Sequence, residues 1–297
     1  MEIKPNFLIV GAAKCGTTSI FEYIRSHPEV YMPSCKEVSY YAGRRDGYSF
    51  SFEEYLSYFS KAKSQKRIGE ASGAYLYSES APLKIIDTLG KEIKIIMILR
   101  NPPDMAYSLW AHNKREGYEN LSFKKAIRQE NDRMNDYTFR EHLQTWLYQY
   151  AYVDRATYAP QVKRYFDVFG KKNVKVYIYE EFFADTDNSL LDLYDFLEIT
   201  HHRRKPFTKK YNVAGEIRSR KVQQFYANEH FFTEPIRKVV PAPIRRGMIN
   251  WLSKINLRRT TRQPMNEEIK EQLQNQFQKS ILELEVLLNR ELVTLWK

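Results

Sequence analysis

The sequence predicts an α/β fold of the P-loop-like, three-layer type, in which a central and mainly parallel sheet is flanked by helices. Short apolar segments alternate with amphipathic helical patterns, as expected for parallel strands joined by helices. The first apolar segment runs directly into a glycine loop and a helix, in the stretch FLIVGAAKCGTTSIFEYI at residues 7–24. A chain of 297 residues without a low-complexity tract is expected to form a single domain over residues 1–297.

Composition and periodicity place the elements of this fold. Runs rich in β-branched and aromatic residues predict strands at residues 7–10, 93–99 and 174–179. Amphipathic patterns predict helices at residues 18–26, 102–113, 142–169 and 189–197. A C-terminal helix is predicted over residues 265–297, where apolar residues three or four apart form one buried stripe. These residues are Ile269, Leu273, Phe277, Ile281, Leu284 and Leu288.

Two long segments, residues 42–66 and 200–262, are expected to be loops with short helices that cover the substrate or the cofactor. The aromatic residues of the first segment are expected to be divided between the wall of an acceptor pocket and the core. In the second segment, residues 234–262 hold eight Lys/Arg and one acidic residue. In a chain of net charge +11, this excess indicates either an acidic partner or a solvated basic face.

The loop between Gly11 and Gly16 has the form of an anion site. A glycine loop that opens a helix directs backbone N–H groups and the helix N-terminus at a bound anion. The pattern of nucleoside-triphosphate loops requires a lysine directly after the second glycine. Thr17 holds that place here, and the only lysine of the loop, Lys14, lies inside it. The sequence therefore predicts an anion site that differs from the ordinary triphosphate loop.

A second anion site is predicted where the strand at residues 93–99 ends. Arg100 follows this strand, and Ser108 lies about two turns into the next helix. Ligands of open α/β sheets bind beyond the carboxyl ends of the strands. A guanidinium can bind two phosphate oxygens while a nearby hydroxyl binds a third. Two separate anion sites suit a nucleotide with phosphate at both ends.

These motifs resemble a known enzyme family. PNFLIVGAAKCGTTSIFEYIRSHPEV is similar to the 5′-phosphosulfate loop of sulfotransferases that use 3′-phosphoadenosine 5′-phosphosulfate (PAPS), and IKIIMILRNPPDMAYSLW resembles their 3′-phosphate motif. KEVSYY, GEASGAYLY, YIYEEF and LNRELVTLW match further segments. The resemblance covers nearly the whole chain and is closer to the bacterial and heparan-sulfate-type branch than to the cytosolic phenol and steroid enzymes.

The resemblance implies how the donor is bound. Lys14 would stabilise the charge that develops on the bridging oxygen as the sulfuryl group leaves. The 5′-phosphosulfate would be held by the loop and the first turn of the helix, that is by Lys14, Cys15, Gly16, Thr17, Thr18 and Ser19. Arg100 and Ser108 would bind the 3′-phosphate. Arg218, in the stretch NVAGEIRSRK, would contact it from a covering loop. No metal is expected, because a phosphosulfate needs no magnesium.

The resemblance also implies a catalytic base. In the heparan-sulfate-type enzymes, the motif similar to KEVSYY carries a catalytic glutamate, which corresponds to Glu37. This chain departs from the family at Ser39, where a histidine is frequent, and at Ala71, where the related stretch often has a lysine after the glutamate. Glu70 is therefore the reserve candidate for the base.

The function that follows is transfer of a sulfuryl group from PAPS to a hydroxyl or amine of a small-molecule or saccharide acceptor, with release of 3′-phosphoadenosine 5′-phosphate (PAP). One alternative is a P-loop kinase that acts on a small molecule. A second alternative is a nucleic-acid or membrane-surface binding protein built around residues 234–262. No RNA-binding or helix-turn-helix signature supports a nucleic-acid partner.

Cysteine content and hydropathy favour a cytoplasmic protein. Cys15 and Cys35 are the only cysteines, and no Cys/His cluster has the spacing of a zinc site. The N-terminus lacks the basic leader of a signal peptide, and no apolar run approaches membrane-spanning length. We therefore expect no metal and no transmembrane segment.

Overall fold

The computed structural model describes residues 3–42, 50–136, 147–202, 215–217, 219, 255–259 and 263–297. These residues contain a five-stranded parallel sheet with the strand order β2-β3-β1-β4-β5. The strands are β1 (Phe7–Gly11), β2 (Val30–Tyr31), β3 (Arg67–Ala71), β4 (Lys94–Leu99) and β5 (Val174–Ile178). The α/β fold with a parallel sheet flanked by helices is thus confirmed.

The central strand β1 is buried along its whole length, which explains the continuous apolar run of its sequence. All of its residues are buried, because β3 and β4 pair with it on both sides and helices cover the faces of the sheet. Parallel strands end at the same edge of a sheet. The loops that follow β1, β3 and β4 are therefore brought together at one edge, where ligands of such sheets bind.

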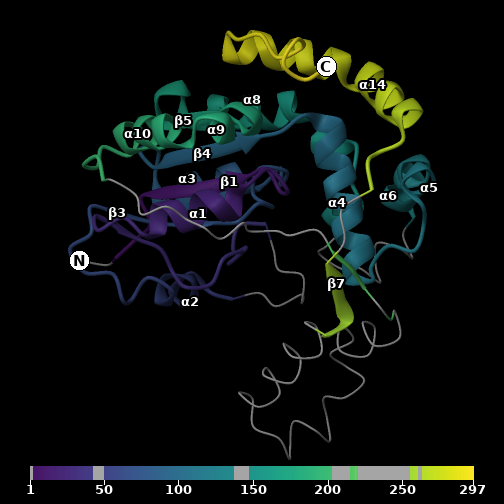
Figure 1. Ribbon diagram of the computed structural model, residues 1–297. Coiled ribbons are helices and arrows are strands. Elements are labelled where there is room, and N and C mark those ends of the chain that lie inside the picture. Colours follow the sequence, from purple (N-terminus) through teal and green to yellow (C-terminus); the bar gives the residue numbers. More distant parts are fainter. Residues whose placement is uncertain are drawn as a thin grey trace, which may run out of the picture.

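The helices surround this sheet. They are α1 (Thr17–Arg25), α2 (Phe52–Ser57), α3 (Ala81–Leu89), α4 (Pro102–Glu116), α5 (Phe123–Arg128), α6 (Glu130–Asn135), α8 (Tyr158–Phe169), α9 (Tyr179–Ala184), α10 (Thr186–Phe196) and α14 (Glu267–Leu288). Short 3₁₀ helices lie at Leu147–Gln149, Asp154–Ala156 and Lys171–Asn173. A separate antiparallel pair joins β6 (Gly215–Ile217) and β7 (Leu257–Arg259), and β7 lies beyond α4, away from the main sheet (Figure 1).

The predicted helix over residues 142–169 is wrong over residues 147–157. Residues 142–146 lie outside the described residues, and the helix α8 begins only at Tyr158. The backbone N–H groups of Tyr152, Val153 and Asp154 donate to the carboxylate of Glu130, at 2.8–2.9 Å, instead of to carbonyls one turn earlier. This use of the N–H groups prevents a continuous helix there.

The C-terminal helix was also predicted too long. The helix α14 ends at Leu288, and Asn289 adopts a left-handed conformation with φ of 50°. The chain then folds back, and the indole N–H of Trp296 donates to Glu180 at 2.9 Å. The amide of Asn101, just after β4, donates to the Trp296 carbonyl at 2.9 Å. The C-terminal residues thus contact the segments that follow β4 and β5 at the carboxyl edge of the sheet.

The buried stripe predicted for the C-terminal helix is confirmed for five of its six residues. Ile269, Leu273, Phe277, Ile281 and Leu284 are buried. The helix α14 packs against α8 and α4 and is the outermost layer over α8 (Figure 1).

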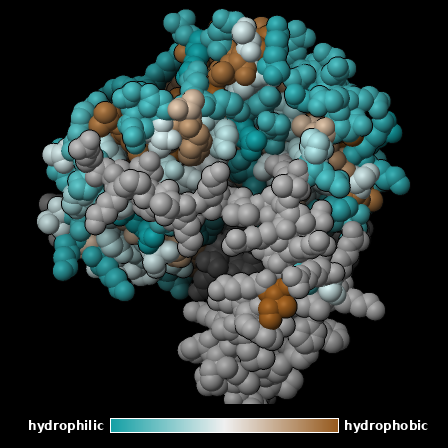
Figure 2. Space-filling view, viewed as in Figure 1, coloured by the Kyte–Doolittle hydropathy of each residue, from teal (hydrophilic) through white to brown (hydrophobic). Residues whose placement is uncertain are grey.

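Among the described residues, no helix is long and apolar enough to cross a membrane. The described surface in Figure 2 is mostly hydrophilic, with hydrophobic residues in small groups.

Candidate active site

The loop after β1 is shaped around Gly16. Gly16 is the N-cap of α1 and has φ of 88°, and a Cβ added to it would lie 2.6 Å from the Phe183 ring. Lys14 also adopts a left-handed conformation, with φ of 64°. No side chain caps the N-terminus of α1, and its first turn contains no acidic residue. A helix N-terminus of this kind attracts an anion.

This loop borders a cavity of about 350 Å³. The cavity is lined by Ala13, Lys14, Gly16, Thr17, Thr18, Lys36, Glu37, Gly73, Ala74, Leu109, His112, Asn113, Gln149 and Arg155. It therefore brings the predicted base Glu37 together with four residues of the predicted anion loop. Cys15, Ser19, Glu70, Arg100 and Ser108 are not among the lining residues.

Glu37 is held in place by the residues that follow β3. Its backbone N–H donates to the Ala71 carbonyl at 2.9 Å, and its Oε2 accepts from the Gly73 N–H at 2.9 Å. Its other carboxylate oxygen forms an ion pair with Lys36. Glu37 has φ of 62°, a conformation that costs about 1–3 kcal/mol for a non-glycine residue and persists only where surrounding contacts hold it. The proposed base is exposed but fixed.

Glu70 lies behind this loop rather than in the cavity. Its side chain is fully buried, and its Oε2 accepts from the Ser72 hydroxyl at 2.8 Å. The same hydroxyl oxygen accepts from the Ser39 N–H at 2.9 Å. Burial raises the pKa of Glu70 from 4.5 to about 7, and the nearby charge of Glu37 acts in the same direction. Glu70 thus contacts the segment that carries Glu37 through Ser72, and of the two glutamates only Glu37 is among the described lining residues.

The Cys15 side chain faces the core. Its thiol lies 3.6 Å from the Tyr158 hydroxyl and donates to the Ala13 carbonyl at 3.3 Å. Burial raises the pKa of Cys15 to about 12, so the thiol is neutral. If Cys15 contributes to anion binding, it does so through its backbone.

Two of the predicted 3′-phosphate residues, Arg100 and Ser108, are not among the lining residues of the cavity. Arg100 follows β4, where its guanidinium stacks over the Tyr179 ring at 4.8 Å and lies 3.6 Å from the Asp104 carboxylate. The Nε atom of Arg100 has no hydrogen-bond partner among the described residues. Ser108 is half-buried on α4. Arg218 lies outside the described residues, so its predicted contact stays a prediction.

Sequence reasoning missed the side of the cavity formed by Asn113 and Gln149. The Gln149 amide donates to the Asn113 Oδ1 at 3.0 Å, and the Asn113 amide donates to the Tyr152 hydroxyl at 3.1 Å. The Tyr152 hydroxyl in turn donates to Glu119 at 2.9 Å. No motif marks this pair, because it joins residues 36 positions apart through the fold.

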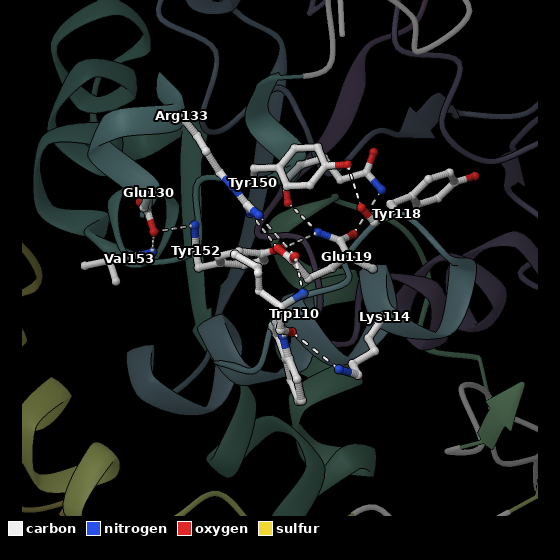
Figure 3. Close-up of polar contacts among 12 residues, drawn as sticks. Trp110, Lys114, Tyr118, Glu119, Glu130, Arg133, Tyr150, Tyr152 and Val153 are labelled. Atoms are coloured by element: carbon white, nitrogen blue, oxygen red, sulfur yellow. Dashed lines mark hydrogen bonds and ion pairs between the residues drawn. The ribbon is translucent and has the colours of Figure 1, made fainter. Parts of the chain in front are cut away.

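A buried ion pair anchors that side of the cavity. Burial alone would raise the pKa of Glu119, but hydrogen bonds from Arg133 hold this pKa below its ordinary value. The Arg133 guanidinium donates to the two Glu119 oxygens at 2.6 and 3.2 Å (Figure 3). The ionised Glu119 is therefore a fixed acceptor for Tyr152, and the amide pair in the cavity is positioned by it.

Comparisons with known proteins agree on one family. A family model described as the sulfotransferase domain matches residues 4–284. The crystal structure of a sulfotransferase from Alicyclobacillus acidocaldarius has a TM-score of 0.71 and 26% sequence identity, and the match covers 99% of each chain.

Curated relatives match over shorter segments. The membrane-associated sulfotransferase kil1 of Dictyostelium discoideum is 33% identical over 138 residues, which are 43% of this chain and 28% of kil1. The bifunctional heparan sulfate N-deacetylase/N-sulfotransferase 4 of Mus musculus is 33% identical over 117 residues, which are 37% of this chain and 13% of that protein. The matches thus span under a third of the length of these two relatives.

Proposed function

The chain belongs to the sulfotransferase family, as its motifs indicated, and we propose that it transfers a sulfuryl group from PAPS to a hydroxyl or amine of an acceptor, releasing PAP. The observation that carries the proposal is the cavity in which Lys14, Thr17, Thr18 and Glu37 meet. It combines an anion-binding loop with a carboxylate, which are the two groups that such a transfer requires.

The loop fits a phosphosulfate group. The N-terminus of α1 has no capping side chain and no acid in its first turn, and the close approach of Phe183 to Gly16 leaves no room for a Cβ there. PAPS supplies the activated sulfuryl group. Thr17 and Thr18 lie where hydroxyl and backbone donors can hold the phosphate. Lys14 offsets the negative charge on the oxygen from which sulfur departs.

Glu37 completes the transfer. The acceptor oxygen or nitrogen forms a bond to sulfur while the bond from sulfur to the phosphate oxygen breaks, and the acceptor proton passes to Glu37. The hydrogen bond from the Gly73 N–H and the ion pair with Lys36 orient the carboxylate for this step.

The cavity favours a polar acceptor, either a saccharide or another hydroxyl-rich small molecule. Lys36, His112, Asn113, Gln149 and Arg155 supply polar groups to its wall. Of the aromatic residues expected near an acceptor pocket, Tyr48 lies outside the described residues. The others, Phe50, Phe52, Tyr55, Tyr58 and Phe59, instead pack against one another and against Tyr40. None of these six aromatic residues lines the cavity, so nothing in the described wall offers a flat apolar surface to a phenol.

We propose a reducing compartment such as the cytoplasm for this protein, because its two cysteines, Cys15 and Cys35, form no disulfide.

Nucleotide binding tests the proposal against the kinase alternative. At a hundredfold excess over its dissociation constant, PAP should stabilise the protein by about 2–3 kcal/mol, and ATP by much less. Arg100→Ala and Ser108→Ala should weaken PAP, because both are proposed to bind the 3′-phosphate that ATP lacks. Labelled PAPS should then transfer its label to one of a panel of sugars, alcohols, amines and phenols, with a chelator present throughout. Equal melting shifts with PAP and ATP would exclude this function.

A further inference from the structure

Arg155 is a buried cation in the cavity wall. It lies in the 3₁₀ helix before α8 and is 5% exposed. Its Nη2 donates to the Gly73 carbonyl at 3.0 Å, and its Nη1 donates to the Tyr148 carbonyl at 3.3 Å. No carboxylate forms an ion pair with it in the part of the chain that the structure describes. By contrast, Arg133 is paired with Glu119.

Among the described residues that line the cavity, cations outnumber carboxylates. Arginine stays protonated in proteins, and burying its charge without a counter-ion is costly. Lys14, Lys36 and Arg155 line the cavity, and Glu37 is the one carboxylate among the described lining residues. Glu37 already forms an ion pair with Lys36. The described wall therefore presents more positive than negative charge to a bound ligand, which favours an anionic group.

Gly73 places Arg155 beside the proposed base. The Gly73 N–H donates to Glu37, and the Gly73 carbonyl accepts from Arg155. Glu37 and Arg155 are thus held by the two polar groups of one residue, and both line the same cavity as Lys14. Arg155 therefore borders the same space as the anion loop and the proposed base.

We infer that Arg155 binds the oxygens of the sulfuryl group as it is transferred, a catalytic role additional to those of Lys14 and Glu37. This inference rests on the proposed function. Arg155 donates hydrogen bonds and transfers no proton, so it stays a guanidinium while sulfur exchanges its phosphate oxygen for the acceptor atom. Two of its five N–H groups are used by carbonyls, which leaves donors for the sulfuryl oxygens.

The test compares PAPS with PAP, which differ by the sulfuryl group. Arg155→Gln should raise the dissociation constant of PAPS by about tenfold or more and lower turnover by about 10²-fold, while PAP affinity stays within about twofold. Arg155→Lys keeps the charge and should recover a large part of both losses. The matched control is Arg164→Gln on α8. Arg164 also donates to a carbonyl, that of Ser78 at 3.1 Å, and does not line the cavity, so PAPS affinity and turnover should not change.

The possible outcomes distinguish a failure of the proposed function from a failure of the role of Arg155. A parent protein that binds neither PAP nor PAPS overturns the proposed function and this role with it. Arg155→Gln that weakens PAP as much as PAPS, or leaves PAPS binding and turnover unchanged, overturns the role of Arg155 alone. Unchanged PAP affinity reports that the loop is intact. If Arg155→Gln does not fold, Arg155→Lys with a normal PAP affinity must still discriminate less between PAPS and PAP than the parent.

Discussion

The backbone N–H of Gly73 donates a 2.9 Å hydrogen bond to the carboxylate of Glu37, although these residues come from two different loops. Gly73 follows β3, and Glu37 follows the short strand β2. A second bond, from the Glu37 N–H to the Ala71 carbonyl, joins the Glu37 loop to the last residue of β3. The proposed base is thus held by the end of a sheet strand and the loop after it, in addition to Lys36 in its own loop.

This arrangement makes Glu37→Gln an informative variant. The glutamine oxygen can still accept from Gly73, but the side chain cannot take a proton, so turnover should fall by about 10²–10⁴-fold. PAP affinity should barely change, because Glu37 is not part of the anion loop. Turnover and PAP binding of Glu37→Gln and Glu70→Gln should be measured side by side. If Glu37→Gln stays within a few-fold of the parent while Glu70→Gln is inactive, the base is Glu70.

Glu70 should be visible in the pH dependence of stability. Its folded pKa of about 7 lies above its ordinary 4.5, so the folded state binds the proton more tightly than the unfolded state. Stability is therefore fully retained below about pH 4.5 and falls as the pH rises to about 7, by about 3 kcal/mol for this one group. Glu70→Gln should remove that decline and leave turnover within about tenfold of the parent, because Glu70 does not line the cavity and glutamine can still accept the Ser72 hydrogen bond.

Denaturant unfolding of Glu70→Gln and of the parent from pH 4 to pH 8 would measure this contribution. Glu130→Gln is the control, since burial also raises the pKa of Glu130 to about 7 while Glu130 does not line the cavity. It should change the pH slope without changing the nucleotide affinity. An unchanged slope in Glu70→Gln would show that its carboxyl does not titrate in this range.

The sequence predicted those parts of the site that are contiguous in the chain. The anion loop was visible because Gly11, Lys14 and Gly16 lie within a few residues of one another between a strand and a helix. Arg155 and Gln149 gave no such signal. Arg155 meets Gly73 across 82 positions of the chain, and only the fold joins them.

The strand β3 was missed for a different reason. Its sequence RIGEA contains no continuous apolar run. A Cβ at Gly69 would lie 2.3 Å from the Phe7 carbonyl oxygen, so the close approach of β1 excludes any larger residue there. Glu70 is buried in the same strand, where an apolar residue would be expected. The two residues that are unusual in a strand, Gly69 and Glu70, are thus those that the close packing of β1 and the contacts near Glu37 require.

Gly16→Ala should damage the anion loop. The φ of 88° and the 2.6 Å approach to the Phe183 ring both oppose a Cβ, so the loss of stability should be about 1–3 kcal/mol, with weaker PAP binding. Gly170→Ala is the matched control, because Gly170 also has a positive φ but nothing lies within 4 Å of its Cβ position. It should lose about 1 kcal/mol at most and bind PAP normally. Equal PAP affinities for the two variants would contradict the predicted role of Gly16.

Lys14→Ala should differ from every variant of the base, because Lys14 is proposed to act on the donor. Loss of its charge removes stabilisation of the departing phosphate oxygen, so turnover should fall by about 10²–10³-fold. The ground-state contact with the phosphosulfate is lost as well, and PAPS affinity should fall with turnover.

Lys36→Ala is the comparison, since Lys36 pairs with Glu37 in the same cavity. This variant should lower turnover while PAP affinity stays near that of the parent, because Lys36 is paired with the proposed base. Nucleotide titration and single-turnover transfer for both variants would distinguish these effects. If Lys14→Ala had normal PAPS affinity and normal turnover, Lys14 would have no role in the transfer.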